Sequence, residues 1–379
     1  MNLRFSDQRG DQLPSEGEPD SAGWPDVSAS STTVAEASST VAGEAKSGIG
    51  GLPRVRWRAL VRAGATQDYI GVLLATVVLV LGVGAFYPTF LSVGNLLDIL
   101  SQATTVALLA CGMAFLLSMR ELDLSVGSIY GLTALCAAIL IHSGKPSWLG
   151  VVVGILIGTA LGLTNGLLIQ FFRLPSIVAT LATMSIFRGL IYALSDGKPV
   201  LALPLTDPFS EVMGAKPLGI PTSVWVMVIV TAILIITLRA TPFGYRVRSI
   251  GSNPDAAVFS GLPVKRVRLL AFALMGTLGG LVGMLFLGYF GSTDPNLGVG
   301  YELLAIAAAV IGGTPLRGGK ASMVGAVFGS ILLSVVSAGL AYFNVPINWT
   351  AFATGIVILL AVSLDSLLRR SRTGRNSLL

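Results

Sequence analysis

The sequence predicts an all-α fold, a polytopic membrane helix bundle with about ten transmembrane helices. Apolar residues make up 53% of the 379 residues and charged residues only 12%, against roughly 25% charged in an average soluble domain. Uncharged runs such as 70–86 and 222–238 approach the roughly 20 residues that cross a bilayer. Insertion into a membrane explains these runs more simply than a soluble fold does.

The two ends of the chain differ from this apolar region. Residues 1–50 contain eight acidic and three basic side chains, and little besides Phe5 and Trp24 to bury, so we expect a disordered cytoplasmic tail. Residues 51–68 form a basic juxtamembrane segment, and 369–379 form a basic cytoplasmic tail. Because residues 1–10 have no apolar core of a signal peptide, the first span is expected to start insertion and to stay in the mature protein.

We expect one transmembrane domain to cover residues 69–368, with spans separated mostly by short loops. The predicted spans are 69–87, 95–118, 124–142, 147–171, 175–194, 222–239, 267–290, 301–313, 321–343 and 347–368.

Basic residues fix the orientation of these spans, because cytoplasmic loops carry an excess of Lys and Arg. With a cytoplasmic N-terminus, the outer loops contain only Lys145, Lys198 and Lys216, and Arg188 lies inside the fifth span. The inner side then contains Arg54, Arg56, Arg58, Arg62, Arg120, Arg173, Arg239, Arg246, Arg248, Lys265, Arg266, Arg268, Arg317, Lys320, Arg369, Arg370, Arg372 and Arg375. Both termini are therefore expected inside, and the bases are topology signals rather than a nucleic-acid site.

Two predicted helices are interrupted. Such breaks are tolerated in a membrane only where protein buries them or where they line a cavity. The segments 108–130 and 304–327 share an apolar run, a charged break and a restart containing Val-Gly, which favours a parallel internal repeat. The membrane-break motifs comprise Asp123, Ser125, Gly127, Gly312, Gly313, Gly318 and Gly319.

Few residues suggest chemistry on a substrate. The segment TPLRGGKA at Thr314 lacks the first glycine and the final hydroxyl of a phosphate-binding loop. Cys111, Cys136 and His142 are expected to be structural. Arg120, Glu121 and Asp123 are either a solvated cluster with local ion pairs or a structural re-entry point, and Asp98 is the one serious candidate for ion coupling.

Two loops are long enough to have functions of their own. The inner loop 239–268 contains GSNPDAAVFSG, in which a capping residue, Pro at the first helical position and a closing Gly predict a short helix outside the membrane. That helix is either an ordinary loop helix or an element that presents Val258 and Phe259 to a partner. The outer loop 195–221 fits a gate, a docking segment or a plain linker.

Six motifs in order give the chain a resemblance to a known family. They are NLLDILSQ at Asn95, LDLSVGS at Leu122, NGLLI at Asn165, ATLATMSIFRGL at Ala179, GSNPDAAVFSGLPV at Gly251 and GYELLAIAAAVIGGTPLRGGKAS at Gly300. With them, the region from about residue 87 to 364 resembles the permease subunits of ribose-type, or type II, ATP-binding-cassette (ABC) importers of sugars. Family members usually show a glycine just before DLSVGS, where this chain has Met119, Arg120 and Glu121.

The resemblance implies a transport subunit of the bacterial inner membrane that performs no chemistry itself. The implied partners are a second permease copy in a homodimer or pseudo-dimer, an extracytoplasmic binding protein for a monosaccharide or similar polyol, and two cytoplasmic ATPase subunits, which would bind ATP and Mg. No cofactor or metal is expected in this chain. The resemblance makes one segment the coupling helix that contacts the ATPase: Asn253, Pro254, Asp255, Ala256, Ala257, Val258, Phe259, Ser260 and Gly261.

A pathway for a neutral sugar needs polar, uncharged side chains. Our candidates are Asn95, Gln102, Thr104, Ser128 and Asn165. Two other classes stay open on the sequence alone. One is an ion-coupled secondary transporter, which would depend on Asp98, and the other is a membrane scaffold that transports nothing.

Overall fold

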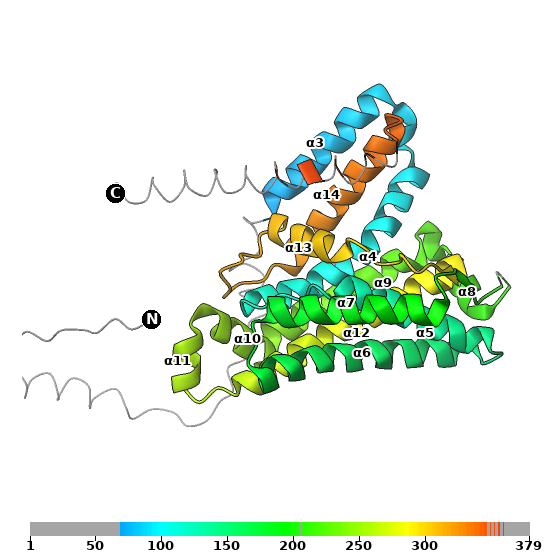
Figure 1. The fold of residues 1–379 in the computed structure, drawn as a ribbon. Helices are drawn as coiled ribbons and strands as arrows, with labels where there is room; N and C mark the ends of the chain where they lie inside the picture. Colours follow the sequence, from blue (N-terminus) through cyan, green and yellow to red (C-terminus); the bar gives the residue numbers. More distant parts are fainter. Residues whose placement is uncertain are drawn as a thin grey trace, which may run out of the picture. The chain divides into compact units, whose positions relative to one another are not determined.

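The computed structural model describes residues 69–204 and 206–346, together with Trp349, Phe352, Gly355, Ile356 and Leu359. The predicted tail 1–50, the basic segment 51–68 and the tail 369–379 lie outside the described residues, as does most of the tenth predicted span, 347–368. Within the described part the fold is an all-α bundle with one two-stranded β ladder (Figure 1), which confirms the predicted fold class.

Each of the first nine predicted spans corresponds to a helix. Six of these helices are long and apolar enough to cross a membrane. The helix α13 has only 11 residues, or about 16 Å, and so reaches about half of the roughly 30 Å hydrocarbon core. The nine helices are α3 (Ile70–Phe86), α4 (Val93–Ser118), α5 (Val126–His142), α6 (Ser147–Phe172), α7 (Ser176–Ser195), α9 (Thr222–Ala240), α12 (Val264–Phe290), α13 (Tyr301–Ile311) and α14 (Met323–Tyr342).

The connecting segments contain short elements, most of which hydropathy alone does not reveal. The expected helix of the inner loop is α11 (Pro254–Phe259), and a second amphipathic helix, α10 (Pro242–Ser252), precedes it. In the outer loop, β1 (Val200–Leu201) pairs antiparallel with β2 (Ser292–Thr293). The remaining short elements are η1 (Pro88–Leu91), α8 (Pro208–Gly214) and η2 (Pro217–Gly219).

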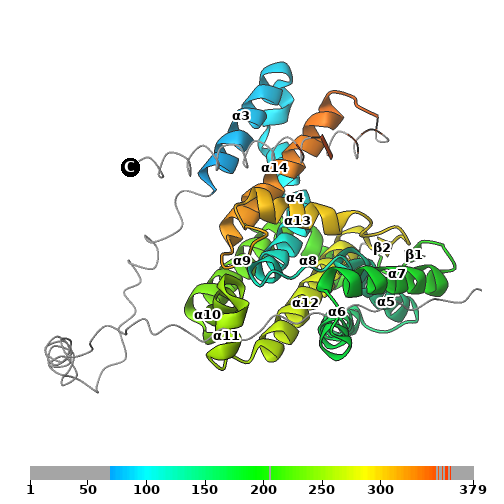
Figure 2. The same ribbon diagram turned by 60° about the vertical axis from the view of Figure 1, so that its left-hand side comes forward.

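The helix α12 is central to one half of the bundle and packs along α6 and α5 (Figures 1 and 2). Glycines permit the close approach of α6 to α12, since a Cβ at Gly158 would lie 2.5 Å from the Gly276 carbonyl oxygen and 2.8 Å from the Gly280 Cα. The hydroxyls of Thr159 and Thr277 form a 2.8 Å hydrogen bond across the same interface. Backbone contact between small residues is a common way for membrane helices to associate.

The helices α13 and α14 pack against α4, and α3 packs against α14 to complete this second group. The second half of α4 is buried from Val106 to Ser118, because it lies between α12 on one side and α13 and α14 on the other. Near the start of α4, the rings of Tyr87 and Phe90 pack edge-to-face on Tyr342 of α14. This buried part of α4 leads directly into the first break.

Candidate functional site

The first break covers residues 119–125, between α4 and α5. Arg120 adopts a left-handed conformation with φ 64° and ends α4. Beyond it, Ser176 Oγ accepts a 3.2 Å hydrogen bond from the Leu122 amide, and Thr180 Oγ1 accepts a 3.1 Å bond from the Leu124 amide. Side chains of α7 thus replace the helical partners that the break lacks, as a low-dielectric environment requires.

A buried polar cluster lies in the middle of this break. The carboxylate of Asp123 accepts hydrogen bonds from the Ser125 amide at 2.8 Å and the Ser125 hydroxyl at 2.6 Å. The Asn165 side-chain amide on α6 donates to Ser125 Oγ at 2.7 Å and lies 3.4 Å from Asp123 Oδ2. All three side chains are buried within this chain. They therefore fix the path of the break against α6.

A second break, residues 291–300 before α13, meets the first one. Gly298 and Gly300 have positive φ values of 84° and 82°. The guanidinium of Arg188 on α7 donates to the carbonyls of Pro295 at 3.2 Å and Leu297 at 2.9 Å. Gly127 at the start of α5 packs directly on the Gly298 carbonyl and the Glu302 carboxylate. The starts of α5 and α13 therefore converge, with backbone dipoles and polar groups at their meeting point.

The third irregular segment runs from Gly312 to Ser322, between α13 and α14. Gly313, Gly318 and Gly319 have positive φ values, a conformation that glycine adopts without strain. The Gly319 amide donates to the Ser118 carbonyl at the end of α4 at 2.8 Å. The segment TPLRGGKA thus packs against a helix end, and not between a strand and a helix as in a nucleotide-binding loop.

The five candidate pathway residues lie at different places. The Asn95 side-chain Nδ2 donates to the Phe90 carbonyl, the Thr104 hydroxyl to the Leu100 carbonyl and the Ser128 hydroxyl to the Met184 carbonyl. Gln102 is exposed on α4, whereas Asn165 belongs to the buried cluster around Asp123. The structure does not bring the five together at one place, and their role in a pathway stays a prediction.

The predicted coupling segment has an exposed apolar tip. Asn253 Oδ1 accepts a 3.0 Å hydrogen bond from the Ala256 amide, and Ser260 Oγ donates to the Ala256 carbonyl at 2.7 Å. Ala257 is buried. Val258 is 62% exposed and Phe259 is 90% exposed. A short capped helix thus presents two large apolar side chains that are mostly exposed in the part of the chain that the structure describes.

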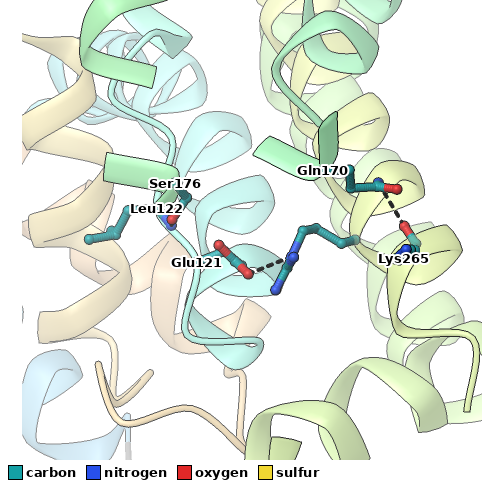
Figure 3. Close-up of polar contacts among 6 residues, drawn as sticks. Glu121, Leu122, Gln170, Ser176 and Lys265 are labelled. Atoms are coloured by element: carbon teal, nitrogen blue, oxygen red, sulfur yellow. Dashed lines mark hydrogen bonds and ion pairs between the residues drawn. The ribbon is translucent and has the colours of Figure 1, made fainter. Parts of the chain in front are cut away.

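The charge cluster at residues 120–123 contacts several other elements. Glu121, with a side chain only 10% exposed, forms a 2.6 Å ion pair with Arg268 of α12, marked by the dashed line at Glu121 in Figure 3. Arg120 binds the end of α10. Of the two readings of this cluster, a buried structural re-entry point describes the geometry better than a solvated loop.

The other residues considered in the sequence are Asp98, the two cysteines and His142. Asp98 is exposed on α4. Cys111 is buried and Cys136 half-buried, and neither forms a disulfide within the described residues. His142 Nδ1 donates a 2.8 Å hydrogen bond to the Leu201 carbonyl. Among the residues that the structure describes, no group of three or more His, Cys, Asp or Glu side chains could ligate a metal.

Sequence reasoning missed the contacts of Arg188, and of Arg120 and Glu121 with α10 and α12. The signal for Arg188 was available, because a charged residue inside an apolar span is costly unless it is paired. For Arg120 and Glu121 no local signal existed, since their partners lie more than 100 residues further along the chain.

Comparison with known proteins identifies the class of protein. Residues 95–362 match the model of a family described as branched-chain amino acid transport system / permease component. The chain belongs to this family of transport permeases.

Among curated relatives, the ribose import permease protein RbsC of Haemophilus influenzae is 35% identical, with 78% of this chain and 92% of that protein aligned. The Bacillus subtilis RbsC is 39% identical over the same shares, and the L-arabinose ABC transporter permease protein AraH of Azospirillum brasilense is 34% identical over 83% of this chain and 91% of that protein. These relatives confirm the resemblance to sugar-importer permeases and a multi-pass membrane permease, and they do not favour the ion-coupled alternative.

Proposed function

We propose that this chain forms the translocation pathway for a monosaccharide or a similar polyol in an ATP-driven importer. The family description names amino acid transport, whereas relatives that are 34% to 39% identical are named for ribose import and for an L-arabinose ABC transporter. Their alignment covers more than 90% of each relative's length. The sugar class therefore follows from these relatives, and the individual sugar is left to experiment.

The partners we propose are two cytoplasmic ATPase subunits, a second permease copy and an extracytoplasmic binding protein. ATP and Mg would be bound by the ATPase subunits, and this chain would perform no catalysis and bind no cofactor. The chain would lie in the bacterial inner membrane with both termini in the cytoplasm. One observation carries this proposal, namely that Val258 and Phe259 are exposed on α11, as expected for a helix that docks into a groove of another protein.

The direct test is uptake into proteoliposomes that contain this permease, its co-encoded ATPase and the cognate binding protein. We expect ATP-dependent accumulation of ribose, arabinose or a related sugar. Phe259→Asp should reduce uptake at least about tenfold, because a charge in an apolar docking site costs more than about 1.4 kcal/mol. Leu218→Asp is the matched control, since Leu218 is an apolar residue that is also 90% exposed and lies in η2, outside the predicted spans and outside α11.

Two results would contradict the proposal. One is the absence of ATP-dependent accumulation with every sugar tested. The other is uptake that depends on an ion gradient and persists with an ATPase that cannot hydrolyse ATP, in which case Asp98→Asn should abolish it.

A further inference from the structure

Three backbone segments from distant parts of the chain meet where α4 ends. A Cβ added to Gly251, near the end of α10, would lie 2.7 Å from the Ser118 carbonyl carbon and 2.8 Å from the Gly319 amide nitrogen. Gly319 itself donates its hydrogen bond to Ser118. No side chain separates these segments at their contact. A shift of α10 must therefore displace the end of α4, or break this contact.

Arg120 strengthens the same contact with its side chain. Its Nε donates to the Gly251 carbonyl at 2.9 Å and its Nη2 to the Ser252 carbonyl at 3.0 Å. These two residues are the last of α10, and Asn253 next to them is the N-cap of α11. The last carbonyls of a helix lack intrahelical partners and carry partial negative charge, so a guanidinium is a favourable partner there.

Glu121, the next residue, connects the break to α12, the helix that follows α11 in the chain. Its partner Arg268 is the fifth residue of α12, which begins at Val264, five residues after α11 ends at Phe259. Arg268 retains 30% exposure of its side chain, against 10% for Glu121. In Figure 3 the Glu121 carboxylate points toward the ribbon of α12, while Leu122 and Ser176 lie on the opposite side of the break. The two adjacent residues thus bind the helices on both sides of α11.

The same break is also bound on its far side. The amides of Leu122 and Leu124 bind α7, and Asp123 is held by Asn165 of α6. The residues between α4 and α5 therefore directly join the helices flanking α11 with the polar cluster inside the bundle. A displacement of α11 reaches Asp123 through two residues, Glu121 and Leu122, rather than through a long chain of side chains.

We propose that Arg120 and Glu121 are positioning residues that transmit movement of α11 to the first membrane break, and thereby couple ATP hydrolysis to transport. This inference rests on the proposed function, because it assigns α11 to the contact with an ATPase. Neither residue needs to touch the substrate.

The test measures how many sugar molecules are imported for each ATP hydrolysed in the reconstituted importer. Arg120→Gly removes the side chain and keeps the left-handed backbone free of strain. We expect it to assemble and to hydrolyse ATP at a basal rate similar to the parent protein, with sugar imported per ATP reduced about fivefold or more.

The chain offers a closely matched control. Arg173 is also a basic residue with positive φ, 54°, that follows a helix end, and its side chain forms no hydrogen bond within the part of the chain that the structure describes. Arg173→Gly should therefore leave the import ratio unchanged. An unchanged ratio in Arg120→Gly, or an equal loss in both variants, would overturn the role of Arg120.

A charge exchange tests Glu121 even if Arg120→Gly folds poorly. Glu121→Lys should lower the ratio, and the double variant Glu121→Lys with Arg268→Glu should restore at least half of it by rebuilding the ion pair. Failure of the double variant to recover, while it is present in the membrane at normal levels, would overturn the role of the pair. A parent protein without ATP-dependent uptake would instead overturn the proposed function itself.

Discussion

At the scale of single residues, the polar cluster of Asp123, Ser125 and Asn165 is buried, so each of its side chains needs a hydrogen-bond partner. Asn165→Leu would remove the amide that binds Ser125 Oγ and would leave a buried carboxylate with fewer donors. We expect a loss of about 1–3 kcal/mol in stability, the usual cost of an unsatisfied buried polar group. A lower midpoint of thermal unfolding in detergent would show it.

The neighbouring residue provides the control for that measurement. Thr164 is exposed on the same helix, and its hydroxyl donates only to the Ala160 carbonyl one turn earlier. Thr164→Val should leave the midpoint within the error of the parent protein. Equal midpoints for Asn165→Leu and Thr164→Val would mean that the cluster contributes nothing to stability.

The sequence predicts residues well where the controlling interaction is local. The helix α11 could be predicted because its cap, its proline and its closing glycine lie within nine residues. The break motif at Asp123, Ser125 and Gly127 was also identified from its charge and glycine pattern. Its contacts were not, because Asn165, Ser176 and Arg268 reach it only through the tertiary fold, and no local pattern encodes such distances.

At the scale of elements, the interface between α6 and α12 depends on glycine. A Cβ at Gly276 would lie 2.8 Å from Cα of Gly162 and would overlap the Gly158 carbonyl. Gly276→Val would force the two helices apart, because backbone atoms cannot move aside as a flexible side chain can. We expect much less folded protein in the membrane, measured as the monodisperse fraction after extraction in mild detergent.

Gly82 on α3 is the control for this element, since nothing lies within 4 Å of the position of its Cβ. Gly82→Val should give a monodisperse fraction close to that of the parent protein. If Gly276→Val behaves as Gly82→Val does, the close approach of α6 to α12 is not needed for folding.

Hydropathy predicted the long helices because a helix that crosses the lipid bilayer needs about 20 mostly apolar residues in a row, and this composition can be read from the sequence. It did not predict α8 and α10, since these helices lie in loops and depend on tertiary contacts. Phe209 and Met213 of α8 pack against Gly288, and Val247 and Ile250 of α10 are buried. The helix α13 is short because it lies between two irregular segments, the break before Tyr301, which Arg188 stabilises from another helix, and the glycines after Ile311.

At the scale of the whole described bundle, basic loops gather at the end of α12 that is next to α11. Arg120 contacts α10, Gln170 near the end of α6 donates to the Lys265 carbonyl, and Gly319 contacts Ser118. The helix α8 lies at the opposite end of α12, a helix of 27 residues (Figure 1), or about 40 Å. The loops that the charge count assigned to one side of the membrane are therefore neighbours in space.

This arrangement makes a testable prediction of orientation. In a background with Cys111→Ala and Cys136→Ala, single cysteines replace Asp255 on α11 or Glu211 on α8, both exposed positions. A membrane-impermeant maleimide added to intact spheroplasts should label Glu211→Cys and leave Asp255→Cys unlabelled until the membrane is permeabilised. The excess of Lys and Arg at the α11 end requires this result, because positively charged loops stay on the cytoplasmic side. Labelling of both positions in intact spheroplasts, or of Asp255→Cys alone, would contradict the predicted orientation. In that case α11 could not reach a cytoplasmic ATPase.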